Sequence, residues 1–200
     1  MGTRRMTGPE RAAQLLDVAE LLFVEQGYET TTLEDIAQRA GVSRPVVYQH
    51  HGSKDGLYLA CVTRARVGLV ERSGQAMEGV TDPLVAMRAA ADVWFAEVER
   101  DPRRWELLHT DSVARLNLAV DDVRPVMPSN APFYEAALGR WARPDVEPRL
   151  IASAVEMIIG AGVGLAHWWI RNPEVSRQQV VDDLVQFCWQ GLSALLPHLD

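Results

Sequence analysis

The stretch that decides the fold runs from Thr31 to Leu57 and reads TTLEDIAQRAGVSRPVVYQHHGSKDGL. Either Thr31 or Thr32 can cap a helix, because an acidic residue three positions later completes a capping box. Gly41 is placed to end that helix, since glycine adopts the left-handed conformation that turns the chain sharply. Apolar residues between them repeat at the i, i+3, i+4 and i+7 positions of one helix face: Leu33, Ile36, Ala37 and Ala40. The pattern predicts a short helix followed by a tight turn.

A second short helix is predicted directly after the turn. Ser43 and Pro45 can open it, because proline is tolerated in the first turn of a helix. Val42 and Val47 then point back toward the first helix. The outward face carries Arg44, Pro45, Val46, Tyr48 and Gln49. Such a face suits the major groove of DNA, which accepts a long forked donor, apolar tips and an amide. The alternative is two ordinary packed helices.

The motif resembles the DNA-binding domain of the TetR family of bacterial transcriptional regulators. The resemblance spans roughly residues 8 to 60 and lies in Thr31–Leu33, Ile36–Ala37, Ala40–Ser43, Val47–Tyr48 and Ser53–Leu57. It implies a three-helix DNA-binding domain over residues 1–52, and a larger all-helical domain over residues 53–200 that binds an effector and dimerises. One departure is His51, which stands where the family places an aromatic residue inside the small domain.

The expected DNA contacts divide into base contacts and phosphate contacts. Arg44 and Gln49 are predicted to read base edges, as their donor and amide groups suit. Tyr48 and His50 resemble the family's phosphate-binding residues, and Thr32 and Lys54 are predicted to join them. The complete predicted set is Thr31, Thr32, Ser43, Arg44, Pro45, Val46, Tyr48, Gln49, His50 and Lys54.

Lys54 is the single lysine of a chain that has nineteen arginines. It follows Ser53, a plausible helix N-cap, so its ammonium would lie beside free backbone N–H groups at a helix start. Both groups favour a phosphate. The alternative is an ordinary solvated surface charge.

The net charge of −7 does not argue against DNA as a partner, because the charge is unevenly distributed. Residues 1–66 carry eight basic and eight acidic side chains, so the whole negative excess belongs to residues 67–200. Site-specific binding needs a local positive surface and not a basic protein. Arg4, Arg5 and Arg11 make the amino end locally basic, unless they belong to a solvated tail.

Helix signals continue along the rest of the chain, and the fold class predicted is all-α. The first helix should start near Thr7, with Glu10 completing a capping box, and stop at Gly27. Further helices are predicted from Ser53, from Asp82–Pro83, from Asp101–Pro102, from Glu147–Pro148 to Asn172–Pro173, and from Ser176 to Pro197, with an irregular loop over residues 121–132. Alternating strand patterns and internal repeats are absent from the sequence.

The last two predicted helices are apolar over more than one face, which is typical of a helix shared between subunits or central in a core. The TetR resemblance implies the first alternative, a homodimer through a four-helix bundle. The predicted interface consists of Leu150, Ile151, Ala154, Val155, Ile158, Gly162, Leu165, Trp169, Val181, Leu184, Val185, Cys188 and Leu192. Gly160, Gly162 and Gly164 would let the partner helix approach closely.

A small effector, apolar or aromatic, is predicted to bind in the middle of the chain. All six tryptophans lie beyond residue 93, and small-molecule sites are commonly aromatic cavities with a few polar tips. The candidate lining consists of Trp94, Phe95, Trp105, His109, Met127, Phe133, Tyr134 and Trp168. The alternative is that these residues are plain core.

Other classes of protein find little support in the sequence. The glycines of residues 160–164 follow no strand, and no hydrolase, nucleotide-binding or metal-ligand motif is present, so neither an enzyme nor a metal or cofactor is predicted. Cys61 and Cys188 are expected to be reduced core residues. Met1–Gly8 lacks the apolar segment of a signal peptide, and the uncharged run Met157–Ile170 is too short to span a bilayer. The sequence therefore predicts a cytoplasmic protein without a membrane partner.

Together these features predict a ligand-responsive transcriptional regulator of double-stranded operator DNA, and specifically a repressor of a palindromic operator. The alternative is an architectural DNA-binding dimer that has no effector.

Overall fold

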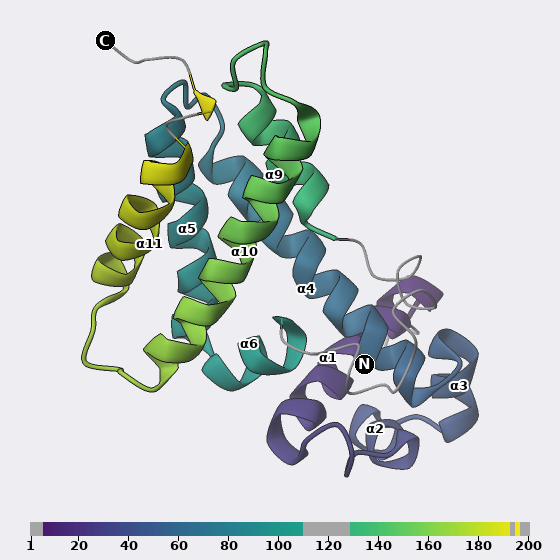
Figure 1. Cartoon of the computed structure of the whole chain (residues 1–200). Helices are drawn as coiled ribbons and strands as arrows, with labels where there is room; N and C mark the ends of the chain where they lie inside the picture. The colour runs from purple at the N-terminus through teal and green to yellow at the C-terminus, as the bar shows by residue number, and fades with distance from the viewer. Residues whose placement is uncertain (1–5, 110–128, 193–194, 197–200) are drawn as a thin grey trace. The chain divides into compact units, whose positions relative to one another are not determined.

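The structure is a computed structural model that describes residues 6–109, 129–192 and 195–196. Within these residues the regular secondary structure is helical, which agrees with the predicted all-α class (Figure 1). The chain divides into two compact units, Met1–Ala65 with Arg103–Pro128 and Arg66–Pro102 with Ser129–Asp200. Helix α4, Lys54–Ala76, contributes its first half to the first unit and its second half to the second.

The first unit contains α1 (Gly8–Gln26), α2 (Leu33–Ala40), α3 (Arg44–His51), the start of α4 and most of α6 (Pro102–His109). Thr7 caps α1 as predicted: its backbone N–H donates to the Glu10 carboxylate at 2.7 Å, and its hydroxyl accepts from the Glu10 N–H at 3.4 Å. Gly27, with φ of 89°, ends the helix at the predicted residue.

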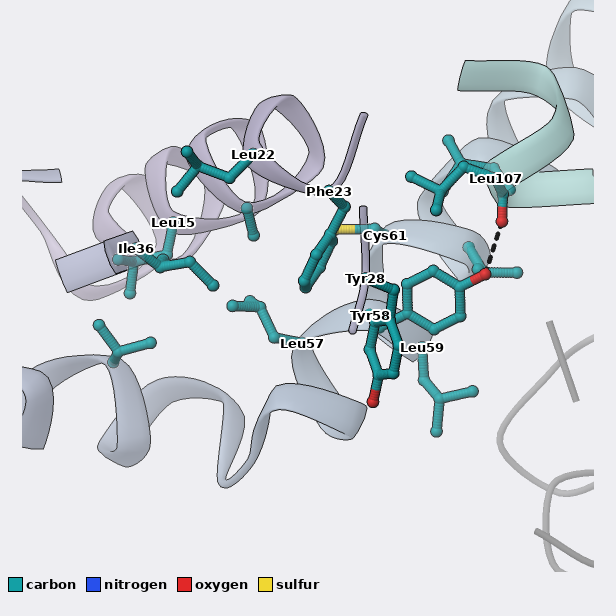
Figure 2. Packing of buried hydrophobic residues seen from close by; sticks show 14 of the residues in the cluster. Leu15, Leu22, Phe23, Tyr28, Ile36, Leu57, Tyr58, Leu59, Cys61 and Leu107 are labelled. Carbon is teal, nitrogen blue, oxygen red and sulfur yellow. Dashed lines mark hydrogen bonds between the residues drawn. The ribbon is translucent and has the colours of Figure 1, made fainter. Parts of the chain in front are cut away.

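The core of this unit joins α1, α2, α3 and α4. Figure 2 shows part of it, where Leu15, Leu22 and Phe23 of α1 face Ile36 and Leu57. Each of these side chains is almost completely buried, and burial of one such side chain stabilises a fold by about 1.5–3 kcal/mol. The rings of Phe23, Tyr28 and Tyr58 lie with centroids 4.9–5.7 Å apart and add edge-to-face and tilted contacts.

Helix α6 is tied to the amino-terminal helices. The Tyr58 hydroxyl donates to the Leu107 carbonyl at 2.5 Å, as Figure 2 shows, and Leu107 and Leu108 are part of the core. The Arg104 guanidinium forms an ion pair with the Glu20 carboxylate, and the Arg64 guanidinium forms a second one with the same carboxylate at 2.9 Å. The first half of α4 and most of α6 therefore group with the DNA-binding motif in one compact unit. A helix's apolar stripe shows that it packs, but not against which neighbour.

The second unit contains the rest of α4 with α5 (Pro83–Arg100), α9 (Ala131–Gly139), α10 (Pro148–Ile170) and α11 (Arg177–Leu192). Asp82 caps α5, and its carboxylate accepts from the N–H groups of Leu84 and Val85 at 2.8 and 3.2 Å. Helix α10 packs against α9, α11 and α5, and α11 packs along α5 (Figure 1). The predicted starts at Pro83 and Pro148 are confirmed.

Ion pairs fasten the helices of the second unit to α5. Arg177 of α11 contacts Asp92 and Glu99, both at 3.2 Å. The carboxylate of Glu97 is buried and receives Arg72 of α4 at 3.2 Å and Arg100 at 2.8 Å. A buried carboxylate needs such partners, because an unpaired buried charge is strongly destabilising.

Helix α10 corrects one inference about hydrophobic length. Among the helices that the structure describes, α10 is the one that is long and apolar enough, by its 23 residues and its composition alone, to cross a membrane. The uncharged run that starts at Met157 understates its length, since Glu156 does not interrupt the apolar character of the residues before it. The same composition is found in a helix that packs against other helices and also has an apolar exposed side. Helix α10 is of this kind, because it packs against α5, α9 and α11 and exposes Met157.

Candidate nucleic-acid interface

Helix α2 begins with a capping box built by Thr32 and Asp35. The Thr32 N–H donates to the Asp35 carboxylate at 2.8 Å, and the Thr32 hydroxyl accepts from the Asp35 N–H at 3.2 Å. Thr32 is exposed, so it remains a candidate phosphate contact. Thr31 does not: it is fully buried, and its hydroxyl donates to the carbonyls of Gly27 at 2.8 Å and Leu22 at 3.3 Å. The prediction that Thr31 contacts DNA is therefore wrong, because its side chain fastens the α1–α2 loop from inside.

The turn between α2 and α3 has the predicted geometry. Gly41 has φ of 67° and ψ of 36°, in the left-handed region, and the Val42 N–H donates to the Ala37 carbonyl at 2.9 Å. This bond closes the helix end in the way that glycine favours. Ile36, Ala37 and Ala40 are buried as the spacing predicted.

Helix α3 buries a single residue, Val47, and turns its other side chains outward to different degrees. Tyr48 is 64% exposed. Exposed with it are Ser43, Arg44, Pro45 and Gln49, whereas Val46 and His50 are half-buried. Ser43 has the extended backbone of an N-cap, but its hydroxyl makes no capping bond. The predicted outward face thus exists, and its contacts with DNA stay a prediction.

Lys54 lies elsewhere than the sequence suggested. Ser53 does cap α4, since its hydroxyl accepts from the Gly56 N–H at 2.9 Å. The Lys54 ammonium, however, turns toward the α1–α2 loop, where it donates to the carbonyls of Tyr28 at 3.0 Å and Glu29 at 3.2 Å. It also stands 4.3 Å from the centroid of the Tyr28 ring. Two of its three N–H donors are used by the protein, so one remains for a phosphate.

His51 occupies the position of the expected aromatic residue and packs as a half-buried ring. Its Nε2 lies 3.4 Å from the Ala12 carbonyl of α1, and burial lowers the pKa of the imidazole. The neutral ring therefore replaces an apolar ring while it keeps a polar contact to the backbone. Gly56 allows the close approach of the chain at this corner, because a Cβ at this position would stand 2.3 Å from the His51 carbonyl oxygen.

The lysine and arginine residues between positions 8 and 60 are Arg11, Arg39, Arg44 and Lys54. Arg39 is engaged with Glu25 at 3.1 Å in an exposed pair, and Arg11 donates to Gln14. Arg4 and Arg5 lie outside the described residues. Arg44 is exposed at the first position of α3. Arg44 and Lys54 are therefore the basic residues that the described part of the motif offers to DNA most directly.

The predicted effector lining separates into side chains with different surroundings. Phe95 and Trp105 are 0% and 1% exposed, so they pack as core residues, which is the alternative that the sequence left open for them. Trp105 and His109 belong to the first unit, and Met127 lies outside the described residues. In the second unit Phe133 packs with Met77, Ala86 and Ala137, and Tyr134 hydrogen-bonds Ser73 at 3.1 Å. Trp94 lies beside Gly162, and Trp168 is exposed.

The predicted dimer interface needs a larger correction, because most of it is buried within one chain. Nine of its residues are core residues of the second unit: Ala154, Val155, Gly162, Trp169, Val181, Leu184, Val185, Cys188 and Leu192. They face inward because α10 and α11 pack against α5 as well as each other. Ile151, Ile158 and Leu165 are half-buried, and Leu150 is exposed.

A different apolar surface is exposed on the same two helices. Met157 and Phe187 are 67% and 77% exposed, and Leu150 and Trp168 are also in solvent. Gly160 and Gly164 are exposed with open space beside them. The outer face, as we name this surface, consists of Leu150, Met157, Gly160, Gly164 and Trp168 of α10 and Phe187 of α11. Its α10 members are spaced by seven, three, four and four residues, which places them on one side of the helix.

Comparison with known proteins agrees with this architecture. The family model described as "Bacterial regulatory proteins, tetR family" matches residues 15–61. The chain is 33% identical over 195 residues to the HTH-type transcriptional activator FasR of Mycolicibacterium smegmatis, which covers 94% of this chain and 86% of that protein.

Solved structures show the same fold over nearly the whole chain. The fatty acid degradation regulator FadR from Bacillus halodurans superposes with a TM-score of 0.72 at 18% identity, over 92% of this chain and 96% of that one. A SmeT–triclosan complex superposes with a TM-score of 0.66 at 23% identity, over 94% and 93%. The chain belongs to the TetR family of bacterial regulatory proteins and is a helix-turn-helix, DNA-binding transcriptional regulator, not an enzyme.

Proposed function

We propose that this regulator is a homodimeric repressor that places its two α3 helices in successive major grooves of a palindromic operator, and that a small apolar or aromatic effector releases it. The observation that carries the proposal is the exposure of Arg44, Tyr48 and Gln49 on a helix that buries only Val47. A helix with one anchoring residue and a polar outer side suits insertion into a groove.

One group of residues in the motif contacts base edges, and a second group contacts phosphates. Arg44 donates to a guanine edge and Gln49 bonds an adenine edge, while the small and apolar tips of Ser43, Pro45 and Val46 meet neighbouring bases. A second group positions the protein on the sugar–phosphate backbone and consists of Thr32, Tyr48, His50 and Lys54. The exposed N-terminus of α2 at Thr32 supports a phosphate there, since its first N–H groups and the helix dipole attract an anion.

Dimerisation through the outer face provides the second reading helix. Exposed Met157 and Phe187 support this assignment, because large exposed apolar side chains that gather into a patch mark an interaction site. The exposed glycines at 160 and 164 allow a partner helix to approach α10. A two-fold interface contains each side chain twice, so a modest surface supplies a large apolar area.

The effector acts through the second unit and reaches the motif through α4, which is continuous between the units. The second half of α4 is held by the Arg72–Glu97 ion pair and the Ser73–Tyr134 hydrogen bond. A ligand that disturbs these contacts tilts α4 and changes the spacing of the two reading helices. An allosteric coupling of about 1–3 kcal/mol corresponds to a 5–150-fold loss of operator affinity.

Selection of operator sequences from a pool of random duplexes, followed by footprinting, tests the DNA-binding part of the proposal. We expect two inverted half-sites separated by one helical turn or a multiple of it. A selected sequence without two-fold symmetry would count against the dimer. A promoter fusion with the selected operator then measures whether expression falls, as a repressor requires, or rises, as the name of the FasR relative describes for that protein.

The alternative function is an architectural DNA-binding dimer without an effector. A thermal-shift screen with small apolar and aromatic compounds separates the two, because a ligand that binds only the folded state raises the melting temperature. A compound that stabilises the protein and weakens operator binding supports the effector-controlled repressor. Stabilisation by none of a broad set supports the architectural dimer.

A further inference from the structure

Two oppositely charged neighbours, Lys54 and Asp55, converge on one tyrosine of the DNA-binding unit. The Lys54 ammonium donates to the Tyr28 carbonyl at 3.0 Å and stands 4.3 Å from the centroid of the Tyr28 ring. The Tyr28 hydroxyl donates to the Asp55 carboxylate. One residue of the α1–α2 loop thus contacts both charged groups of the first turn of α4.

These contacts keep the two charges apart. Lys54 and Asp55 form no ion pair with each other within the part of the chain that the structure describes, although they are adjacent in sequence. A carboxylate with a free oxygen beside an ammonium would pair with it and reduce the charge available to a phosphate. The phenol opposes this by fixing the orientation of the Asp55 side chain through its Oδ1 atom, so the carboxylate does not turn toward the ammonium.

Tyr28 is fixed well enough to hold both groups. Its side chain is buried, and its ring packs against Phe23 and Tyr58 with centroids 5.5 and 4.9 Å away. Figure 2 shows its hydroxyl directed away from the Leu107 carbonyl, which Tyr58 bonds instead. Burial raises the pKa of Tyr28 and the bond to Asp55 raises it further, so the phenol stays a donor throughout the neutral range.

We propose that Tyr28 is the positioning residue of the Lys54 phosphate contact: its carbonyl and ring hold the ammonium, and its hydroxyl holds the Asp55 carboxylate away from it. The proposal rests on the proposed role of Lys54 in phosphate binding. It adds a residue that touches no DNA itself and determines how much of the lysine's charge reaches a phosphate.

The salt dependence of binding to a mixed-sequence duplex of about 30 base pairs measures this charge, because each phosphate contact adds about one unit to the slope of log K against log salt. We expect Lys54→Ala to flatten the slope by about one unit. Tyr28→Phe keeps the ring and the carbonyl but frees Asp55, so we expect it to flatten the slope by a similar amount. The double variant Lys54→Ala with Tyr28→Phe should equal Lys54→Ala alone.

Two further variants distinguish a positioning role of Tyr28 from a contribution to the stability of the fold alone. Asp55→Asn in the Tyr28→Phe background removes the competing charge and should restore the wild-type slope. Tyr58→Phe also removes a tyrosine hydroxyl, the one that bonds Leu107 at 2.5 Å in the same aromatic group, and should lower the melting temperature without changing the slope.

The outcomes are distinct. A Tyr28→Phe slope equal to that of the wild type, or a flattened slope that Asp55→Asn fails to restore, overturns the positioning role while the Lys54 phosphate contact stands. An unchanged slope for Lys54→Ala overturns the phosphate contact itself and the positioning role with it. Thermal unfolding of each variant verifies that the compared proteins are folded.

Discussion

The indole of Trp94 lies against Gly162, where a Cβ would stand 3.6 Å from the Trp94 Nε1. This contact between α5 and α10 explains why a glycine that looks like a site of helix approach between subunits is internal to one chain. Leu184 of α11 meets the same point, with its methyl carbon 3.9 Å from that Cβ position. Substitution of Gly162 or Leu184 by a charged residue would therefore damage the second unit itself.

A dimerisation test requires residues of the outer face, and Met157→Arg and Phe187→Arg are the appropriate variants. Both side chains are more than half exposed in one chain, so the folded unit should tolerate arginine. In a two-fold dimer each charge would be buried twice, and unpaired buried charges split interfaces. Sedimentation should give folded monomers, and a mobility-shift assay should show operator affinity lost.

Val85→Arg is the matched control, because Val85 is an exposed apolar residue of α5 that does not belong to the outer face. It should leave both the dimer and the operator complex intact. Tight operator binding by a Met157→Arg protein that sediments as a monomer would show that dimerisation is not required for binding.

Gly56→Ala tests the corner between α3 and α4. The added methyl would stand 2.3 Å from the His51 carbonyl oxygen, a backbone atom that cannot move without displacing the end of α3. Overpacking of this kind costs about 1–3 kcal/mol, which chemical denaturation should detect. Operator binding should weaken beyond the loss of stability, since α3 would be displaced.

Gly74→Ala provides the comparison in the same helix. Its Cβ position lies 3.7 Å from the Phe133 ring, an ordinary contact, and alanine in a helix interior is more stable than glycine by roughly 0.5–1 kcal/mol. Equal effects of the two substitutions would mean that the α3–α4 corner relaxes easily.

Local features of this fold could be predicted from the sequence, and non-local ones could not. The capping boxes at Thr7 and Thr32 and the turn at Gly41 depend on residues within four positions of one another, and all three are confirmed. The choice between Thr31 and Thr32 was open, because either threonine has an acidic residue three positions later. Only the packing of Thr31 beneath α1 decides it.

The predictions that the structure corrects all concern tertiary packing. Val181 and Trp105 have the spacing of residues that pack, but spacing does not distinguish the core of one chain from a dimer interface or a ligand cavity. The Lys54 ammonium could likewise point toward the N–H groups at the start of α4 or away from them. It points toward the α1–α2 loop, because the carbonyls of Tyr28 and Glu29 accept its hydrogen bonds. Such partners are distant in sequence, and no local pattern encodes them.

The half-buried His51 should make the stability of the DNA-binding unit sensitive to acid. Burial lowers its pKa in the folded state, so the folded protein favours the neutral ring. In the unfolded chain the imidazole titrates near its ordinary pKa of about 6.5. The stability that the neutral ring contributes is therefore complete above that value and is lost as the pH falls through the folded-state pKa.

His51→Phe removes this titration and restores the aromatic residue that the family places there. Urea unfolding at pH 7 and pH 5 should show that the wild type loses more stability than His51→Phe over this interval. The difference between the two proteins isolates the contribution of His51 from that of every group the two proteins share. An identical pH dependence would mean that His51 is not stabilised in its neutral form by the fold.

Arg44 should provide the largest single share of sequence discrimination. It lies exposed at the first position of α3 and forms no ion pair within the residues that the structure describes, so its guanidinium is available to a guanine edge. A bidentate contact of this kind discriminates by about 1–3 kcal/mol. Arg44→Ala should therefore weaken binding to the selected operator by roughly 5–150-fold, relax the preference at one position in each half-site, and change binding to a mixed-sequence duplex much less.

Arg39→Ala is the matched control, because Arg39 is already paired with Glu25 at 3.1 Å in an exposed ion pair worth about 0–1 kcal/mol. Competition of operator variants, substituted at each position, against the selected sequence provides the measurement. An equal loss of affinity for operator and mixed-sequence DNA would make Arg44 a phosphate contact, and base reading would then depend on Gln49 and the apolar start of α3.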